Sequence, residues 1–488
     1  MMSDLKDAKS ESAVAVSLSG ADDTPVPSGS EIYIDPEMEK RVMAKFDRYM
    51  LPQITILPFI LFLDRSNIGN AKVFGFEQSL GLVGNQYGNI NTIFYASYVV
   101  FEIPWVVGMK RWGANIVIPI SFVCWSLVTL GTGFVQNYGQ TIALRVLLGV
   151  FESGLFPGLT FLISTIYSRE AQGMRVAFIY LAGALSGAFG GLIAYGIQLM
   201  GDRLGLEAWR WLFIIEGCVS VVICGIAWFT LPKNAENAWF LTTEEKELMQ
   251  RRKQRDIIFK GDDEFSWKYI PMAFKDVHIY IAAMCAFCSS IPLFGFATFL
   301  PTILVGMGYT SMQANYLTIP VYFWGSILLF AAAWVSDHFK NRALVAFVAP
   351  LAVILGYAIA LGTSNAGAGY FAMFLCAGGI YVYNTILYTW IANNLKPDYK
   401  RSVGIPLFAS LSNVSGTISS QIYPSTDAPR YILGNAISLT MEVVAMTGIG
   451  IIFLLLRSRN NKKQKLIDEG VTDNGKDGDK ALDFKYIL

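Results

Sequence analysis

Seven ionisable residues lie inside long apolar stretches of this sequence. They are Asp64, Arg65, Glu102, Arg145, Glu152, Glu216 and Glu442. An arginine in nonpolar surroundings can hold a carboxylate through its planar, forked guanidinium group. A buried carboxyl group can gain or lose a proton as its exposure and its charged neighbours change. These residue types therefore suggest a site that binds an anion and transfers protons.

The spacing of four of these residues supports this interpretation. Arg145 and Glu152 are seven residues apart, which places them on one face of a helix with about 10 Å of rise between them. Asp64 and Arg65 are neighbours and point about 100° apart, so one can face a cavity while the other faces a partner helix. The alternative is that Asp64 with Arg65, and Arg145 with Glu152, are internal ion pairs that only fix the helices. We favour the functional interpretation because buried ion pairs are weak evidence of stabilisation.

The other three acids favour a different interpretation. Glu102, Glu216 and Glu442 each stand alone in an apolar stretch. Structural pairing or a hydrogen bond to a neighbouring helix accounts for each of them better than a role in function.

The elements that carry these residues must lie in a membrane. Of the 488 residues, 53% are hydrophobic and only 15% are charged. The segments 1–50, 232–278 and 457–488 hold 48 of the 75 charged residues, so the other 359 residues hold only 27. Helices of a soluble protein need a polar face, so most of these apolar stretches must face lipid. We expect a polytopic, all-α membrane protein.

Twelve apolar segments are long enough to span a bilayer. We expect spans at about 51–70, 87–109, 114–135, 140–167, 174–200, 211–231, 278–304, 313–336, 343–362, 370–393, 402–423 and 432–456. The corresponding domains are a polar tail at 1–49, a six-helix bundle at 50–231, a linker at 232–277, a second six-helix bundle at 278–456 and a tail at 457–488. Asp35-Pro36 is typical of the start of a short interfacial helix, and Thr242 to Glu247 predict the start of a solvated linker helix.

The distribution of basic residues predicts the orientation. The loops between even and odd spans hold nine Lys and Arg residues, whereas the loops between odd and even spans hold four. By the positive-inside rule, both termini and the linker are cytosolic. The first 49 residues lack the pattern of a cleaved signal peptide, and we expect the first span to act as the signal.

Composition excludes several classes of function. A net charge of +1 gives no reason to expect nucleic-acid binding. The six cysteines lie in apolar stretches and indicate packing rather than disulfides. Cys285 and Cys288 form a C-x-x-C pair, but the sequence has only two His residues. We therefore expect no metal, no cofactor and no enzymatic activity.

Two bundles of six helices joined by a cytosolic linker resemble the major facilitator superfamily, in which the substrate site lies between two repeated halves. Residues 108–113 fall where this superfamily carries a Gly-rich loop motif with Asp and Arg, and residues 336–342 fall in the equivalent loop of the second half. The first copy has Lys110 where an Asp is common. The second copy, with Asp337 and Arg342, is therefore the better candidate for a gating latch. The alternative is that these basic residues only obey the positive-inside rule.

Two longer motifs resemble one family within this superfamily. Phe62 to Ala71 reads FLDRSNIGNA and Arg145 to Gly158 reads RVLLGVFESGLFPG. Both are similar to the anion:cation symporter family, in its fungal allantoate permease branch. The resemblance extends from about residue 36 to the C-terminus and includes Trp209–Gly217 and Asp483–Tyr486.

The resemblance implies proton-driven uptake of a small organic anion, such as nicotinate, pantothenate, biotin, allantoate or a related acid. It also implies that Asp64 and Glu152 titrate while Arg65 and Arg145 hold the substrate. Tyr95, Asn384, Trp390 and Asn413 fall where the family has residues that line the cavity, although packing at helix contacts would explain them equally well.

We therefore predict a twelve-helix symporter of protons and a nicotinate-like monocarboxylate in a fungal plasma membrane, acting as a monomer. An exporter of an acidic secondary metabolite and a nutrient sensor that does not transport remain as alternatives.

Overall fold

The chain is almost entirely helical. The computed structural model describes residues 34–488 except 168, 233–234, 261–273, 340–341, 397, 472–473, 475–477 and 483, and these described residues contain no β-strand. The helices of the first half are α1 (Pro36–Val73), α2 (Phe76–Ser79), α3 (Gln86–Trp112), α4 (Ala114–Thr132), α5 (Tyr138–Glu152), α6 (Leu155–Ile166), α7 (Arg169–Met200) and α8 (Ala208–Thr230). Those that follow are α9 (Thr243–Lys260), α11 (Val277–Gly306), α12 (Ser311–Phe339), α13 (Arg342–Gly362), α14 (Ala366–Asn393), α15 (Asp398–Ser419) and α16 (Ile432–Asp468).

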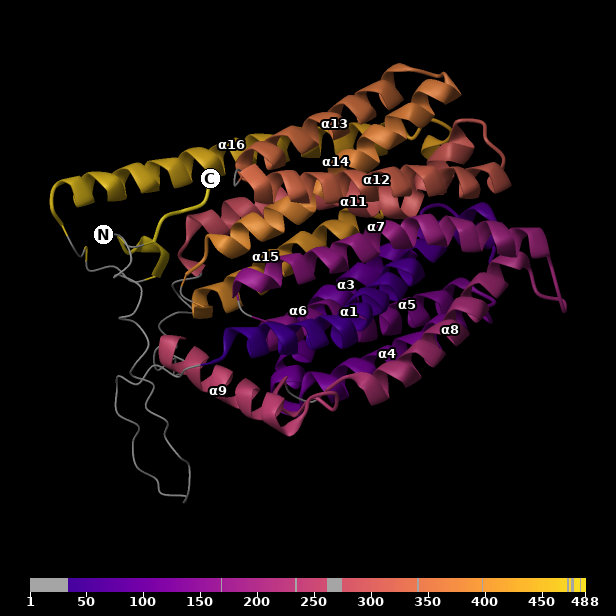
Figure 1. Cartoon of the computed structure of the whole chain (residues 1–488). Coiled ribbons are helices and arrows are strands. Elements are labelled where there is room, and N and C mark those ends of the chain that lie inside the picture. The colour runs from indigo at the N-terminus through magenta and orange to yellow at the C-terminus, as the bar shows by residue number, and fades with distance from the viewer. Residues whose placement is uncertain are drawn as a thin grey trace, which may run out of the picture.

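The helices form two bundles that lie side by side. Figure 1 shows the helices of the first half on one side and α11, α12, α13, α14 and α16 on the other, with α15 next to α3 where the bundles meet and α9 at the edge of the first bundle. Ten stretches of described helix are long and apolar enough to cross a membrane. The prediction of an all-α membrane protein with two bundles of helices is therefore confirmed. α3 and α15 pack against each other between the two bundles.

One predicted boundary was wrong. Residues 36–73 form one continuous helix rather than an interfacial helix followed by a span, although Asp35 caps it as expected by accepting a hydrogen bond from the Glu37 amide at 3.1 Å. The predicted span at 140–167 has a local break at Ser153 and Gly154, which separates α5 from α6, but both residues keep right-handed helical backbone angles and residues 138–160 are still one stretch long and apolar enough to cross a membrane. Gly154 lies so close to Trp105 that an added Cβ would meet the indole Cγ at 2.9 Å. Close packing against α3 thus accompanies the break.

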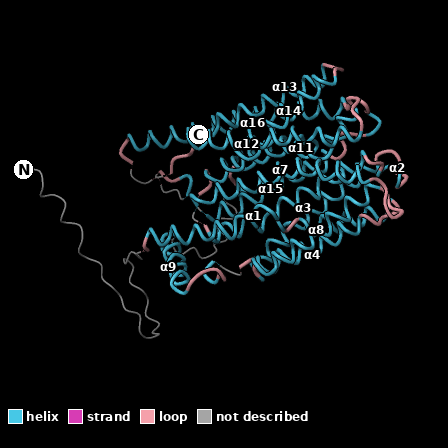
Figure 2. The backbone as a smooth tube through the Cα atoms, turned by 45° about the vertical axis from the view of Figure 1, so that its right-hand side comes forward, coloured by secondary structure: helices cyan, strands magenta, loops and turns pink. Residues whose placement is uncertain are grey.

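The most buried helices lie where the bundles meet. Of the most apolar stretch of each helix, 67% is buried in α11 and 72% in α14, whereas only 28% is buried in α13 and in α16. Both views place α13 at one outer edge of the molecule and α4 at the other (Figure 2). α13 and α16 therefore present most of their apolar surface outward, where lipid would surround them.

The seam between the bundles is formed by three main helix pairs: α1 with α11, α7 with α12, and α3 with α15. We call the end of the molecule that carries α9 and the start of α1 the linker end, and the opposite end the far end. Polar contacts between the bundles concentrate toward the far end. Gln421 donates to Asn89 Oδ1 at 3.2 Å and to Thr92 Oγ1 at 2.6 Å and accepts from Asn85, while Asn315 donates to Gln198 at 3.3 Å.

At the linker end, α9 is fixed to the start of α1. Thr242 and Glu245 form the predicted reciprocal cap, because the Thr242 amide donates to Glu245 Oε2 at 2.9 Å and the Glu245 amide donates to Thr242 Oγ1 at 3.4 Å. Lys45 pairs with Glu245 at 2.7 Å, and Arg252 pairs with Glu39 at 3.1 Å.

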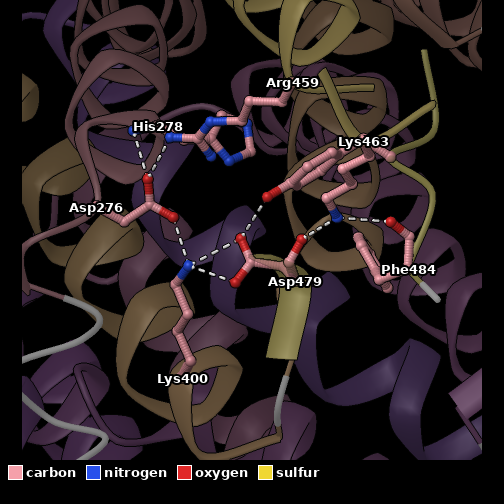
Figure 3. Close-up of polar contacts among 8 residues, drawn as sticks. Asp276, His278, Lys400, Arg459, Lys463, Asp479 and Phe484 are labelled. Carbon is pink, nitrogen blue, oxygen red and sulfur yellow. Dashed lines mark hydrogen bonds and ion pairs between the residues drawn. The ribbon is translucent and has the colours of Figure 1, made fainter. Parts of the chain in front are cut away.

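The C-terminal segment packs against the linker end of the second bundle (Figure 3). Lys400 is fully buried and pairs with Asp276 and with Asp479, the latter at 2.8 Å. Lys463 donates to the backbone oxygens of Asp479 and Phe484. The last residues therefore form part of the folded bundle.

Candidate functional site

A cavity lies between the two bundles and is lined by both of them. Its walls come from α1, α3 and α7 on one side and from α11, α12 and α14 on the other. Its polar lining residues are Arg65, Ser66, Tyr95, Tyr180, Ser186, Thr298, Tyr322, Tyr381 and Asn384. The structure thus brings together three residues singled out from the sequence: Arg65, Tyr95 and Asn384.

Arg65 is the cation in the wall of this cavity. Its Nε forms an ion pair with Glu152 Oε1, and Glu152 is fully buried on α5. The guanidinium lies over three aromatic rings, with its central carbon 4.6 Å from the ring centroid of Tyr98, 5.5 Å from that of Phe94 and 5.7 Å from that of Phe62. Rings at these distances attract a cation through their negative faces. Arg65 is therefore held firmly in place, while its Nη2 has no hydrogen-bond partner.

Asp64 faces away from Arg65, into the first bundle. Its Oδ2 accepts a hydrogen bond from the Trp125 indole at 2.7 Å, and its Oδ1 has no partner. One turn further along α1, Asn67 donates to Glu216 on α8. Glu216 and Asp64 also interact electrostatically. The structure therefore places two carboxyl groups near each other beside α1, within the first bundle.

Arg145 is buried on α5 without a salt bridge to any described residue. Only 3% of its surface is exposed, and its Nε and Nη2 have no hydrogen-bond partner. It interacts electrostatically with Glu152 and Asp64. A buried guanidinium with unused donors has the capacity to accept an anion.

The observed ion pair differs from both pairs that the sequence suggested as alternatives. Glu152 pairs with Arg65 from α1 rather than with Arg145 on its own helix, and Asp64 bonds to Trp125 rather than to Arg65. The reason is that the neighbours Asp64 and Arg65 point to different sides of α1. The ion pair therefore crosses between two helices.

A chain of hydrogen bonds leads from the cavity into the second bundle. Asn384 donates to Ser289 Oγ at 3.2 Å, and Ser289 in turn donates to Glu442 Oε1 at 2.9 Å. Glu442 is fully buried on α16. The predicted hydrogen bond between Glu442 and a neighbouring helix is thus present, with Glu442 as the acceptor, and it connects Glu442 through Ser289 to the cavity residue Asn384.

Other predicted site residues lie elsewhere. Asn413 and Ser410 on α15 donate to Glu102 on α3, at 3.5 Å and 3.2 Å, so Glu102 links the two bundles. Trp390 does not line the cavity, because its indole N–H donates to the backbone oxygen of Ile487 in the C-terminal segment at 2.8 Å.

The two proposed gating residues lie at the linker end. The backbone amide of Arg342 donates to Leu488 at 3.2 Å, and its side chain donates to the Thr389 backbone oxygen at 3.1 Å. The side chain of Asp337 lies outside the part of the chain that the structure describes.

Sequence reasoning missed the aromatic residues around Arg65. Phe94 and Tyr98 are four residues apart on α3 and so share one helical face, as do Phe62 and Arg65 on α1. This spacing shows from the sequence that the two residues of each pair share one face of their helix. It does not show which neighbouring helix that face contacts. Among the described residues, no group of three or more His, Cys, Asp or Glu side chains could hold a metal ion.

The arrangement combines an arginine in a cavity wall, a carboxylate that neutralises it and further buried acids behind it. Such an arrangement is suited to reversible binding of an anion.

Comparisons with known proteins agree with this geometry. The family model described as Major Facilitator Superfamily matches residues 54–420. An uncharacterized transporter of Schizosaccharomyces pombe is 38% identical over 94% of this chain and 92% of its own length. The high-affinity nicotinic acid transporter of Saccharomyces cerevisiae is 36% identical over 99% of this chain and 90% of its own length.

Solved structures show the same fold. A bacterial homologue of the human lysosomal transporter Spinster, in an inward-facing conformation, matches with a TM-score of 0.64 at 15% identity, covering 84% of this chain and 97% of its own. A D-xylose-proton symporter matches with a TM-score of 0.64 at 14% identity, covering 81% of this chain and 96% of its own. With its two helical bundles, its cavity between them and these relatives, the chain belongs to the major facilitator superfamily.

Proposed function

We propose that this protein is a proton-coupled symporter that carries a small organic anion across the fungal plasma membrane. The substrate class is a nicotinate-like monocarboxylate or a related vitamin or allantoate-type acid. The similarity to a nicotinic acid transporter supports this class, and the ion pair between Arg65 and Glu152 supports the coupling.

The ion pair is the observation that carries the proposal. While Glu152 is ionised, it occupies Arg65, which is the described cation in the cavity wall. Freeing Arg65 by separating a buried pair would cost about 3 to 5 kcal/mol. A proton on Glu152 removes this cost, because the neutral acid no longer holds the guanidinium and a substrate carboxylate can replace it. Proton binding and anion binding then favour each other, as linkage requires.

The remaining charged residues have supporting roles in this proposal. Arg145 adds positive charge behind the cavity and compensates Glu152 or the substrate while Arg65 changes partner. Asp64 is the second titrating acid, with Trp125 fixing one of its oxygens. Tyr95 and Asn384 line the cavity from opposite bundles and contact the substrate.

The orientation follows from the basic loops. We propose that the linker end faces the cytosol and the far end faces outward, with Asp337 and Arg342 acting as a gating latch on the cytosolic side and the monomer as the working unit. The far-end contacts between the bundles then correspond to a conformation closed to the outside.

Uptake into cells or proteoliposomes tests the proposal. Accumulation of radiolabelled nicotinate should rise as external pH falls and should collapse when a protonophore is added. Uptake that needs sodium and ignores the protonophore would refute proton coupling. Extrusion of a preloaded acid driven by the same gradient, without accumulation, would indicate an exporter instead.

A further inference from the structure

Lys72 is a second cation on the face of α1 that carries Arg65. The two residues are seven positions apart, which places them on one side of the helix with about 10 Å of rise between them. α1 begins at the linker end, so Lys72 in its last turn lies toward the far end. Figure 2 shows α2, which follows α1 directly, at that end. A buried cation therefore lies on the far-end side of Arg65.

Lys72 is buried by groups from both bundles. Its Nζ lies 3.5 Å from Glu77 Oε1 and 4.3 Å from the ring centroid of Tyr87, both in the first bundle. The second bundle contributes Phe299, whose ring centroid lies at 5.4 Å, and Ser425, whose Oγ accepts a hydrogen bond from Nζ at 3.4 Å. Part of the cover over this cation therefore comes from across the seam.

The polar contacts of Lys72 are long. Charge-assisted hydrogen bonds between a nitrogen and a carboxylate typically measure about 2.7 to 2.9 Å, and Lys400 pairs with Asp479 at 2.8 Å. Both polar contacts of Lys72 exceed this range. Glu77 is also shared, because it accepts from Ser425 at 3.4 Å. An anion can therefore replace these partners more easily than it could separate a tight ion pair.

Opening of the far end removes half of these neighbours. Alternating access separates the two bundles at that end. Phe299 and Ser425 then withdraw from Lys72 with the second bundle, while Tyr87 and Glu77 stay with it. The ammonium group comes to face the open passage. A cation in a passage with low-dielectric walls attracts small anions and raises their local concentration.

Tyr87 connects this cation to a buried arginine. Its ring lies beside Lys72, and it interacts electrostatically with Arg145 on α5. The Nε and Nη2 atoms of Arg145 have no hydrogen-bond partner. In the second bundle, Phe299 directly follows the cavity residue Thr298 on α11. Lys72 therefore lies next to the groups that surround the substrate in the proposed mechanism.

We propose that Lys72 forms an outer anion site, which holds the substrate carboxylate before it reaches Arg65. The site recognises negative charge rather than one particular acid, because an ammonium group is a compact point charge. Glu77 competes for the same cation and keeps binding weak enough for the anion to leave. Closure of the far end brings Phe299 and Ser425 back over Lys72 and displaces the anion inward. The inference rests on the proposed function, which supplies the anionic substrate and the outward direction of the far end.

Initial rates of labelled nicotinate uptake into proteoliposomes, normalised to reconstituted protein, test this site at about 0.01 M and about 0.15 M ionic strength. Lys72→Met should lower Vmax/KM about fivefold to tenfold at the lower ionic strength and much less at the higher, because salt screens the attraction. Lys72→Arg keeps the charge and should stay near wild type. Glu77→Gln removes the competing carboxylate and should raise Vmax/KM about threefold. Arg203→Met is the matched control, because this cation in the loop between α7 and α8 donates to the Met200 backbone oxygen at 3.3 Å.

A purely structural role for Lys72 predicts a different pattern. If Lys72 only holds the bundles together through Ser425, Ser425→Ala should reproduce the effect of Lys72→Met, and the effect should be equal at both ionic strengths. Either result would overturn the outer anion site, and so would a Lys72→Arg protein as impaired as Lys72→Met. Failure of the proposed function appears in the wild type instead, as missing nicotinate uptake or uptake that ignores the proton gradient.

Discussion

At the scale of single residues, the central feature is that Arg65 has one carboxylate partner and three aromatic neighbours. The rings of Phe62, Phe94 and Tyr98 stabilise the guanidinium without neutralising it. The cation therefore stays in place whether Glu152 or a substrate carboxylate pairs with it. A site of this kind can exchange one anionic partner for another without rebuilding its walls.

Glu152→Gln tests whether this exchange drives accumulation. Glutamine keeps the size of the side chain and an oxygen for Arg65, but it cannot release or take up a proton. Proton-driven accumulation should be lost, while exchange of labelled for unlabelled substrate should persist, because exchange needs no proton turnover. Net uptake, counterflow and surface expression are measured together, with Glu245→Gln in the linker helix as a control. Retained accumulation would contradict the carrier role, and so would joint loss of expression and counterflow.

Arg145→Lys tests the second buried arginine. The unused Nε and Nη2 donors of Arg145 can engage a carboxylate in two places, which an ammonium group cannot do. Losing one charge-assisted hydrogen bond should raise KM for uptake by about tenfold or more. The measurement is the concentration dependence of uptake, normalised to the amount of protein at the cell surface. Unchanged KM would assign Arg145 to a structural role.

At the scale of helices, the sequence indicated where spans lie more accurately than how they pack. Hydropathy located the apolar segments because a bilayer imposes one length on every span. The capping residues Asp35 and Thr242 marked helix starts because their hydrogen bonds are local. The break between α5 and α6 was missed because it accompanies contact with Trp105, a residue 49 positions before Gly154 in the chain.

The candidate site was predictable by residue type but not by partner. Asp64, Arg65, Arg145 and Glu152 could be singled out because charge in an apolar segment is costly. Their pairing could not be derived, because it depends on which face of α1 meets α5. The sequence also does not tell which face of α14 meets the cavity, and for this reason Trp390 was predicted to line it. In the folded chain the indole of Trp390 contacts the C-terminal segment.

Lys400→Met tests the charged cluster at the linker end. Lys400 lies between the carboxylates of Asp276 and Asp479 without solvent contact. Removing the cation leaves buried negative charge uncompensated, so the free energy of unfolding should fall by about 3 to 5 kcal/mol. Thermal unfolding of the detergent-solubilised protein measures this loss. The exposed Lys462 provides a control, and a Lys400→Met protein as stable as Lys462→Met would show that the cluster contributes nothing.

The same cluster should give a defined pH dependence. Burial alone would raise the pKa of Asp276, but Lys400 and Arg459 hold it well below its usual range. A carboxyl group with a depressed pKa in the folded state stabilises the protein above its unfolded pKa of about 3.9 and loses this contribution as pH falls further. In Lys400→Met the buried carboxylates lose this cation, so they take up protons at a higher pH than in the wild type. The difference in stability between wild type and Lys400→Met should therefore be largest at high pH and should shrink as pH falls. A difference that grows as pH falls would contradict this account.

At the scale of the whole molecule, polar contacts between the two bundles concentrate toward the far end. Gln421 uses both ends of its amide there, bonding to Asn85, Asn89 and Thr92 at the start of α3. Alternating access requires the cavity to open to each side in turn. The contacts of Gln421 must therefore break whenever the far end opens, and their strength sets part of the balance between the two conformations.

Gln421→Ala should shift this balance toward a cavity open at the far end. Each lost hydrogen bond contributes about 0.5 to 1.5 kcal/mol, so losing several should change the population by roughly tenfold or more. The readout is the rate at which a membrane-impermeant maleimide, added outside intact cells, labels a cysteine introduced at Thr298 in the cavity wall. Gln313→Ala is the matched control, because Gln313 also lies at the far end but contacts Thr310 of its own loop.

Faster labelling in Gln421→Ala alone would show that the seam controls access. Equal labelling in both variants would mean that the helix pairs, and not these side chains, set the balance. Labelling from the cytosolic side only would reverse the assigned orientation of the far end.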